Sequence, residues 1–292
     1  MRIAILSLQH MKKCTLKGPL KKCSEKLEED TEINVINLED IIVQYDEKGV
    51  NFYFEKENLL EYDAFLIRVD LSVQKELLFL IASTLKNEGK VVVNESYCGL
   101  GSMSDKLSFL SVAKEFDIHH PKTFFVRSYD KLEEILDKMQ FPFIVKDHQG
   151  WQGSSVEKIE KKENLEYLKD AFPKNGLLIQ EYIPIKSDIR VLVVGYTVIG
   201  AMERFSTSDD FRTNISLGGE AKKIELTEEM KTLAERISKE TRNDILGVDF
   251  IFKDDKLLVL EIEECPGVKG FRMATGINVS DKIFEYIYKK VK

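Results

Sequence analysis

The sequence predicts an α/β protein whose C-terminal part is α+β, and two observations carry this prediction. Strand and helix signals alternate through the first third of the 292 residues, an order typical of a parallel sheet with crossover helices. The last third is dominated by short apolar runs that tight turns connect, which is typical of antiparallel hairpins. The length suits about two domains, and a second unit is expected to begin near Glu95.

The N-terminal unit is predicted from apolar runs that alternate with helical spacing. Leu77, Leu78, Ile81 and Leu85 recur at helical intervals and end before Gly89, which favours a helix. The strands of this unit are expected at 2–8, 33–38, 64–68 and 91–94. Its helices are expected at 18–29 and 73–87, and a side hairpin outside the central sheet is expected around 51–54.

The middle unit combines short strands with a polar loop. The loop, 147–155, contains Gly150 and Gly153 and lies between two apolar runs, so it is expected at the tip of a hairpin. Strands are expected at 123–126, 143–146, 156–159 and 177–181. Helices are expected at 104–116, 129–139 and 162–171.

The C-terminal unit is predicted as hairpins covered by helices. Gly195 marks a tight turn between two apolar runs, and the helix expected at 279–292 places Val279, Ile283, Ile287 and Val291 on one stripe. Such a stripe is expected to dock on the body of the protein. The strands are expected at 188–194, 196–205, 246–252 and 257–263, with a further helix at 228–241.

The overall charge excludes some classes of partner. The chain has 50 acidic and 43 basic residues, a formal charge of −7. This balance argues against electrostatic binding to nucleic acid or to an anionic membrane. No apolar stretch approaches the length of about 20 residues that a membrane span needs. Its N-terminus lacks a signal-peptide pattern, and its four cysteines form no CxxC pair, so a cytoplasmic location with reduced thiols is expected.

Several catalytic signatures are absent. The sequence contains no GxxxxGK[ST], no GxSxG and no HExxH, which excludes a P-loop, a nucleophile elbow and a zincin site at the level of the motif. Gly99 and Gly101 follow a predicted strand, but Ser104 stands at the third glycine position of a dinucleotide fingerprint. A Rossmann cofactor site is therefore not favoured.

The most informative pattern is a pair of apolar strands that carry carboxylates. Asp249 lies within one predicted strand, and Glu261 and Glu263 alternate with Leu258, Leu260 and Ile262 in the next. Strand periodicity places the two glutamates on one face and the apolar residues on the other. Clustered carboxylates suit a hard divalent cation, Mg²⁺ or Mn²⁺. A solvent-facing acidic surface of the sheet remains the alternative interpretation.

This metal hypothesis constrains the strand register. Directly opposed residues of two paired strands point to the same face. Asp249 therefore shares a face with Glu261 only if the residue numbers of each opposed pair add up to an even number, as they do for Asp249 opposite Glu261. A strict two-residue turn at 254–255 would instead pair Asp249 with Leu260. We therefore expect an odd-length turn or a β-bulge.

Cationic residues could complement a bound phosphate and metal. Lys146 ends an apolar strand before the glycine-containing loop, where it can meet a phosphate. Lys106 stands in the first turn of a predicted helix, where the helix dipole disfavours a cation unless an anion binds nearby. Arg190, Arg204 and Arg212 lie on or beside neighbouring strands and suit an anionic substrate.

These residues belong to a series of short motifs that resembles a known family. The series is Ser104-Asp105-Lys106, Ile144-Val145-Lys146, Gln180-Glu181-Tyr182-Ile183, Asp188-Ile189-Arg190, Asp210-Phe211-Arg212-Thr213-Asn214, Gly247-Val248-Asp249 and Glu261-Ile262-Glu263-Glu264-Cys265-Pro266-Gly267. In this order, from about residue 95 onward, it resembles the ATP-grasp ligases, and most of all the RimK-like branch that adds glutamate to ribosomal protein S6.

The resemblance implies a fold and a set of binding residues. The implied units are an N-terminal pre-ATP-grasp domain (1–95), a central subdomain with the loop as a lid (96–182) and a C-terminal subdomain with the metal ligands (183–292). ATP is implied to contact Lys106, Lys146, Gly150, Gly153, Ser154, Gln180, Glu181, Tyr182, Ile183, Asp188, Arg212, Thr213 and Asn214. Two Mg²⁺ (or Mn²⁺) ions are implied on Asp249, Glu261 and Glu263, and catalytic roles on Arg190, Arg204 and Arg212.

The resemblance also implies a reaction. Such ligases activate a carboxylate as an acylphosphate and join it to an amine, here a small-molecule or peptide carboxylate and an amino acid such as glutamate. The sequence departs from the family at Glu263, where relatives have Asn. A diverged ATP-binding regulator, or a kinase that phosphorylates without ligation, therefore remains an alternative. Neither the identity of the substrates nor assembly into homo-oligomers follows from the sequence.

Overall fold

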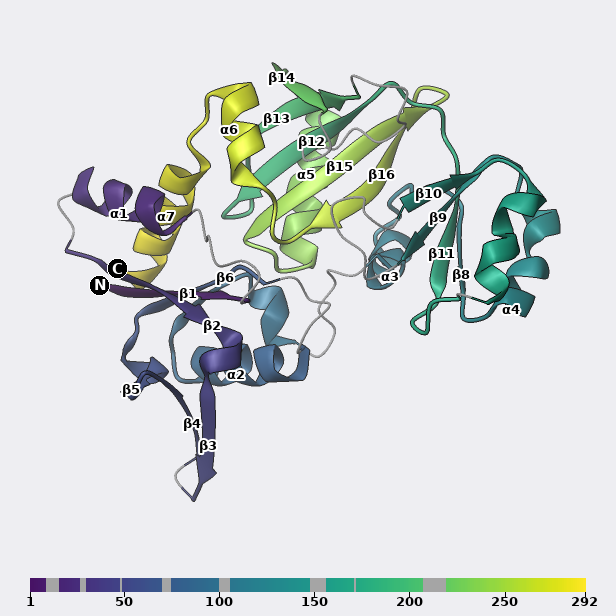
Figure 1. Ribbon diagram of the computed structural model, residues 1–292. Coiled ribbons are helices and arrows are strands. Elements are labelled where there is room, and N and C mark those ends of the chain that lie inside the picture. Colours follow the sequence, from purple (N-terminus) through teal and green to yellow (C-terminus); the bar gives the residue numbers. More distant parts are fainter. Residues whose placement is uncertain are drawn as a thin grey trace.

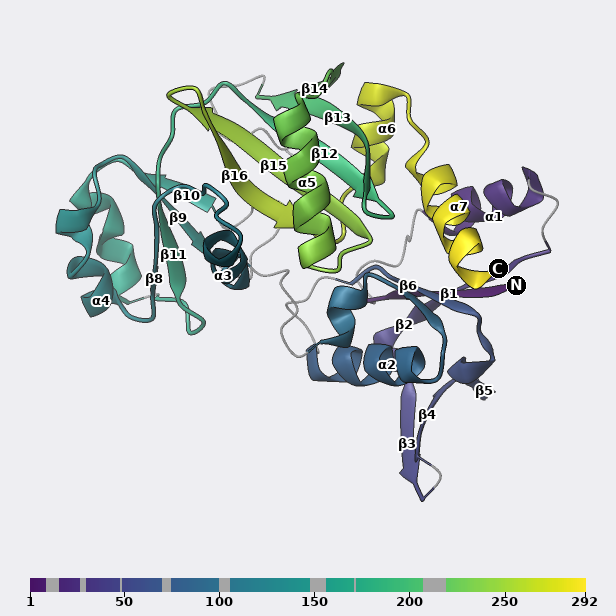
Figure 2. The same ribbon diagram turned by 180° about the vertical axis from the view of Figure 1, so that it is seen from behind.

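The computed structural model describes residues 1–8, 16–26, 30–47, 49–69, 75–99, 106–147, 156–170, 172–206 and 219–292. Within these ranges the strands form three larger sheets and one small one. Figures 1 and 2 show the sheets side by side, with the C-terminal sheet between the other two.

The N-terminal sheet is parallel, as predicted, with strand order β2-β1-β6-β7. Its strands are β1 (Arg2–Ser7), β2 (Glu32–Asn37), β6 (Ala64–Ile67) and β7 (Val91–Val93). All four residues of β6 are buried, as expected for the centre of a sheet that is covered on both faces. Its helices are α1 (Lys17–Lys26), α2 (Lys75–Asn87), η2 (Leu38–Asp40), η3 (Leu59–Glu61) and η4 (Glu95–Cys98), of which the η elements are 3₁₀ turns.

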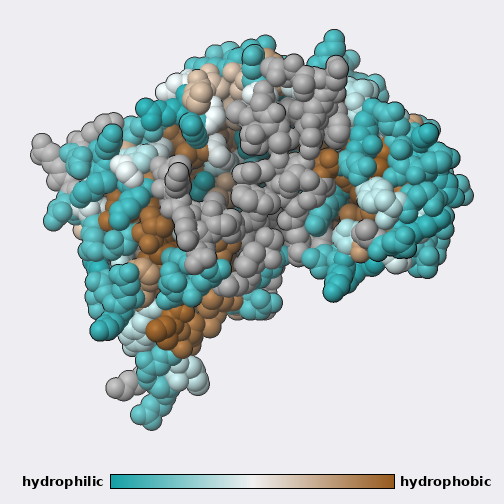
Figure 3. Space-filling model, in the orientation of Figure 1, coloured by the Kyte–Doolittle hydropathy of each residue, from teal (hydrophilic) through white to brown (hydrophobic). Residues whose placement is uncertain are grey.

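The predicted side hairpin forms a separate small sheet. It consists of β3 (Ile42–Asp46), β4 (Gly49–Phe54) and β5 (Glu57–Asn58). Figure 1 shows β3 and β4 projecting away from the body. Phe52 is fully buried and anchors the hairpin, whereas Ile42 and Tyr45 are exposed. Figure 3 shows hydrophobic surface over the same part of the molecule.

The middle sheet is antiparallel, with order β10-β9-β11-β8. Its strands are β8 (Thr123–Val126), β9 (Phe143–Asp147), β10 (Val156–Ile159) and β11 (Leu177–Glu181). The prediction of a continuous helix over 129–139 is wrong: α4 (Tyr129–Glu133) ends early and η5 (Leu136–Lys138) follows. The backbone N–H of Ile135 donates to Leu132 and that of Lys138 to Ile135, and such three-residue spacing is that of a 3₁₀ turn. The helix expected near 162–171 is also 3₁₀, η6 (Lys162–Lys169).

The C-terminal sheet is antiparallel, with order β14-β13-β12-β15-β16. Its strands are β12 (Ser187–Val194), β13 (Thr197–Phe205), β14 (Glu220–Ile224), β15 (Ile245–Lys253) and β16 (Lys256–Glu263). One apolar face packs against α3 (Ser108–Glu115) and α5 (Glu228–Glu240). Strand β14 and α6 (Val268–Thr275) were not predicted, because β14 is polar and α6 is a short helix with an internal glycine.

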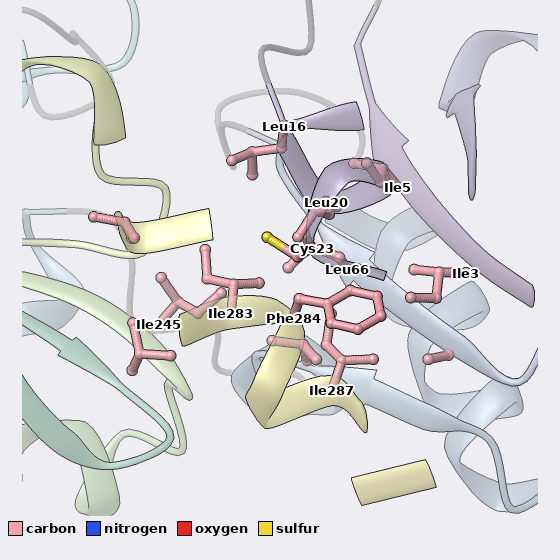
Figure 4. Packing of buried hydrophobic residues seen from close by; sticks show 14 of the residues in the cluster. Ile3, Ile5, Leu16, Leu20, Cys23, Leu66, Ile245, Ile283, Phe284 and Ile287 are labelled. Carbon is pink, nitrogen blue, oxygen red and sulfur yellow. The ribbon is translucent and has the colours of Figure 1, made fainter. Parts of the chain in front are cut away.

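The C-terminal helix joins the first and last sheets. In α7 (Val279–Val291), Val279, Ile283 and Ile287 are buried, so the predicted docking of its apolar stripe is confirmed. Figure 4 shows Ile283, Phe284 and Ile287 among side chains of α1, β1 and β6 on one side and Ile245 of β15 on the other. The core beneath α7 therefore holds the N-terminal sheet against the C-terminal one. None of the helices in the described ranges has the length and apolarity to cross a membrane.

Candidate active site

The β15–β16 hairpin has the register that the metal hypothesis requires. Its turn, 254–255, holds only two residues, both with positive φ (49° and 61°). The register then shifts between Asp249 and Phe250, which leaves Leu260 as an extra residue and pairs Asp249 directly with Glu261. The predicted β-bulge is therefore present, and it brings both carboxylates to one face of the sheet.

The same bulge corrects one part of the prediction. Strict alternation would place Leu258 on the face opposite the glutamates. Instead, fully buried Val259 takes that core position opposite Phe250. The physical reason is that one extra residue reverses the faces of all residues on one side of it relative to those on the other.

Two arginines lie between the carboxylates of this face. Arg190 donates from Nε and Nη2 to the two carboxylate oxygens of Asp249, at 2.7 Å each, and its Nη1 lies 2.9 Å from Glu263 Oε2. Arg204 donates from Nε to Asp188 Oδ1 at 2.8 Å and from Nη2 to Asp249 Oδ2 at 2.7 Å. Strands β13, β12 and β15 are neighbours, so these five residues form one network, called here the arginine–carboxylate network.

Burial and charge set the ionisation of this network. Burial opposes ionisation of Asp249, but Arg190 and Arg204 outweigh it and hold the pKa of Asp249 at about 2. Burial raises the pKa of Asp188 despite Arg204. Burial, together with Glu261 and Asp249, likewise raises the pKa of Glu263 against the effect of Arg190. Carboxylates with raised pKa values are groups that an added cation would stabilise in the charged form.

The carboxylates outnumber the guanidinium groups. Asp188, Asp249, Glu261 and Glu263 carry four negative charges when ionised, against two positive charges on the arginines. Among the described residues, no three acidic, His or Cys side chains converge closely enough to hold a metal ion. The donor chemistry and the excess negative charge fit a divalent cation, while the present hydrogen bonds direct the oxygens of Asp249 and Glu263 to arginine.

A cleft between the middle and C-terminal sheets holds the predicted lysines. Lys106, Lys146, Gln180 and Glu261 line it, together with apolar side chains that include Phe109. The resemblance assigned the first three to nucleotide and the fourth to metal, and the fold brings all four to one place. Further lining residues are His120, Thr123, Leu178, Leu260 and Ile262.

Lys146 is held in a short chain of hydrogen bonds. Its Nζ donates to Gln180 Oε1 at 2.6 Å, and Gln180 Nε2 donates to Thr123 Oγ1 at 2.9 Å. Thr123 in turn donates to the carbonyl oxygen of Pro121 at 2.9 Å. The chain fixes the orientation of the Gln180 amide, so its oxygen faces the lysine. Burial lowers the pKa of Lys146 to about 8, although Glu261 opposes that shift.

The lowered pKa of Lys146 predicts how stability depends on pH. Between about pH 8 and 10.5 the unfolded chain keeps the Lys146 proton and the folded protein loses it, so this residue makes stability rise with pH there. In Lys146→Met that contribution disappears, so the unfolding free energy of the variant minus that of wild type should fall as the pH rises from 8 to 10. Urea unfolding across this range measures it. A difference that is independent of pH would contradict the prediction.

Other predicted residues either are not among those that line this cleft or fall outside the described ranges. Glu181 accepts from the backbone N–H of Lys122 at 2.9 Å and pairs with Lys253, so it connects β11 to the end of β15. Tyr182 lies under Lys158 Nζ, 4.6 Å from the ring centroid, and Ile183, which follows it, is partly buried. The predicted residues Gly150, Gly153, Ser154, Arg212, Thr213 and Asn214 fall outside the described residues.

Two residues that sequence reasoning missed, Asn94 and Asp244, support the C-terminal end of β16. Asn94 has a positive φ of 69°, and its Nδ2 donates to the carbonyl oxygen of Glu264 at 3.0 Å. Fully buried Asp244 accepts from the backbone N–H of Asn94 at 2.7 Å. The site therefore depends on a junction between the N-terminal and C-terminal sheets. His120 was also missed: burial lowers its pKa to about 4, and no sequence pattern marked it.

The chain is similar to known proteins over its whole length. Residues 103–287 match the sequence model of a protein family, the RimK-like ATP-grasp domain. A probable alpha-L-glutamate ligase of Vibrio parahaemolyticus serotype O3:K6 is 30% identical over 297 residues, which cover 100% of this chain and 97% of the relative.

Solved structures show the same fold at low sequence identity. The ATP-grasp ligase PsnB, complexed with a phosphomimetic variant of minimal precursor, Mg and ADP, has a TM-score of 0.73 at 17% identity and covers 99% of this chain and 98% of that one. The macrocyclase MdnC of Microcystis aeruginosa MRC, bound with precursor peptide MdnA, has a TM-score of 0.72 at 14% identity, covering 99% and 100%. Both likenesses run through all three larger sheets and confirm the predicted fold. The matched domain and the full-length relative establish that the chain belongs to the RimK-like ATP-grasp family.

Proposed function

We propose that this ATP-dependent ligase joins the amine of an amino acid, glutamate in the first instance, to the carboxylate of a peptide or small molecule through an acylphosphate. The observation that carries the proposal is the position of Lys106, Lys146 and Glu261 around one cleft, beside the arginine–carboxylate network. Phosphates and an oxygen-seeking cation need these two kinds of group next to each other. The relative from Vibrio parahaemolyticus is a probable alpha-L-glutamate ligase, which supports glutamate as the amine donor.

In this scheme the lysines bind the phosphates and the carboxylates bind the cation. Lys146, which donates to Gln180, would bind the phosphates of ATP, and Lys106 lies in the same cleft. Asp249, Glu261 and Glu263 would hold Mg²⁺. When bound, the metal offsets negative charge on the phosphates and polarises the group that is transferred.

The arginines have a second task in this scheme. Arg190 and Arg204 keep Asp249 ionised, and a carboxylate must be ionised to bind a divalent cation. A bound cation would offset part of the carboxylate charge, and guanidinium N–H groups of Arg190 and Arg204 would then be available to the anionic group that is transferred. No nucleophilic side chain is needed, because ATP supplies the activation and the amine itself attacks the acylphosphate.

The proposal is tested by supplying both substrates. The purified protein is incubated with ATP, Mg²⁺, L-glutamate and pools of peptide and small-molecule carboxylates, and ADP, phosphate and product mass are followed. The expected result is ADP and phosphate in equal amounts, with a product heavier by one glutamyl residue. Release of ADP and phosphate that requires no amine would contradict ligation.

One observation favours a second candidate, a nucleotide-binding regulator. Glu263 stands where the family has Asn, and Arg190 Nη1 lies 2.9 Å from it, so this extra carboxylate already has a partner other than a metal. A regulator would bind ATP tightly and yield no ADP with any pool. A phosphorylated acceptor without an amide product would instead identify a kinase.

A further inference from the structure

A buried arginine at the end of the N-terminal sheet has an unused donor. Arg68 directly follows β6 and is only 9% exposed. Its Nη2 donates to the carbonyl oxygen of Pro266 at 3.0 Å, whereas its Nη1 is shielded from solvent and has no hydrogen-bond partner among the described residues. A buried donor of a charged group without an acceptor destabilises the folded protein. Such a donor marks a place where a ligand can supply the acceptor.

Arg68 lies next to the arginine–carboxylate network. A Cβ built on Gly247 would lie 3.2 Å from Pro266 Cβ and 3.7 Å from Arg190 Nε. Gly247 is the residue that pairs with Glu263 across the hairpin. Pro266 therefore links Arg68 to the end of the hairpin that carries the carboxylates. The carboxyl end of a parallel strand is also where ligands commonly bind in open α/β sheets.

The other two arginines are already occupied. All three guanidinium nitrogens of Arg190 contact Asp249 or Glu263. Arg204 uses Nε and Nη2 on Asp188 and Asp249. Of these three arginines, Arg68 is the one whose buried Nη1 lacks an acceptor. A carboxylate that enters this region without reacting needs a cationic partner, because an unpaired buried charge is strongly unfavourable.

We propose that Arg68 binds the α-carboxylate of the amino-acid substrate, the group that ligation through its amine leaves unchanged. This inference rests on the proposed ligase function and deepens it: the enzyme selects an amine donor with a free α-carboxylate. A guanidinium group matches a carboxylate in geometry and charge, and two parallel N–H donors add specificity. Arg68 thereby positions the amine from the N-terminal side of the site.

The test compares L-glutamate with its α-amide in wild type, Arg68→Lys and Arg68→Met. Wild type should prefer glutamate over the α-amide by about 100-fold in kcat/KM, since loss of a charged partner leaves a buried donor unsatisfied. Both variants should raise the KM for glutamate at least about 30-fold, leave the KM for ATP unchanged, and lose most of the preference for glutamate.

The matched control is Arg236→Met. Arg236 Nη2 also donates to a main-chain oxygen, that of Phe116 at 2.7 Å, but at an exposed position, so this variant should keep wild-type kinetics. If Arg68 only supports Pro266, its variants will lower the melting temperature and kcat while the preference for glutamate stays at the wild-type value. That result would overturn the inference.

Binding measured without turnover separates the two proposals. Glutamate is titrated calorimetrically into each protein in the presence of Mg²⁺ and a non-hydrolysable ATP analogue. Glutamate that binds wild type but not Arg68→Met supports the inference, and a lack of product in the same wild type would then refute only the ligase proposal. Equal binding to both proteins, or none to wild type, overturns the role of Arg68.

Discussion

Glu261→Gln is expected to lower kcat at least about 1,000-fold and to change the unfolding free energy by less than about 1 kcal/mol. Glu261 lies opposite Asp249 on the same face of the C-terminal sheet and lines the cleft beside Lys146. The amide keeps the shape of the side chain but removes the charge that a divalent cation requires. Steady-state ADP release with ATP, Mg²⁺, glutamate and an accepted carboxylate measures the effect.

The matched control for this substitution is Glu203→Gln in the same sheet. Glu203 accepts from Ser187 Oγ and pairs with Lys222, and alternation along β13 places it on the opposite face from Arg204. Its loss should leave kcat within about twofold, since a surface ion pair contributes little. Full activity of Glu261→Gln would remove Glu261 from the metal site.

Arg190→Met is expected to lower the unfolding free energy at pH 7 by about 3–5 kcal/mol, because it leaves the buried carboxylate of Asp249 without its main partner. The pH dependence is diagnostic. Asp249 has a pKa of about 2 in the folded protein against 3.8 unfolded, so its pairing stabilises the fold above pH 3.8 and this stability is lost as the pH falls toward 2. The difference between the two proteins should shrink over the same interval. Urea unfolding at several pH values measures it.

Arg2→Met is the control for the loss of an arginine that contacts several acids. Arg2 pairs with Glu32, Glu57 and Glu61, but these glutamates are at least half exposed. Water replaces the lost partner there, so the expected cost is under about 1 kcal/mol. Equal costs for the two substitutions would show that burial does not strengthen the dependence of the carboxylates on Arg190.

The hairpin that carries the carboxylates shows how far sequence reasoning reached. Alternation in β16 and the position of Asp249 required opposed residues whose numbers add up to an even number. The pair Asp249 and Glu261 meets this requirement in the structure. The location of the bulge at Leu260 did not follow, because an odd-length turn would have satisfied the same arithmetic. The structure has a two-residue turn and not an odd-length one. Near this turn the numbers of opposed residues add up to an odd number, so one extra residue is needed to bring Asp249 opposite Glu261.

The arginines show where sequence reasoning ended. Arg190 and Arg204 were predicted near an anionic site, but their pairing with Asp188 and Asp249 depends on β12 lying between β13 and β15. Strand order is set by the burial of whole faces, which no local pattern encodes. The same holds for Arg68 and Pro266, whose contact spans 198 positions of the chain.

The sequence by itself determined the chemistry available to this protein: the alternating elements, the carboxylate strands, the lysines, and the ordered motifs that place it among ATP-grasp ligases. Only the tertiary structure decided which charges neutralise one another, and that Nη1 of Arg68 has no acceptor among the described residues. Local periodicity sets the face on which a side chain lies. Its electrostatic partner is set by the packing of sheets that are distant in the chain.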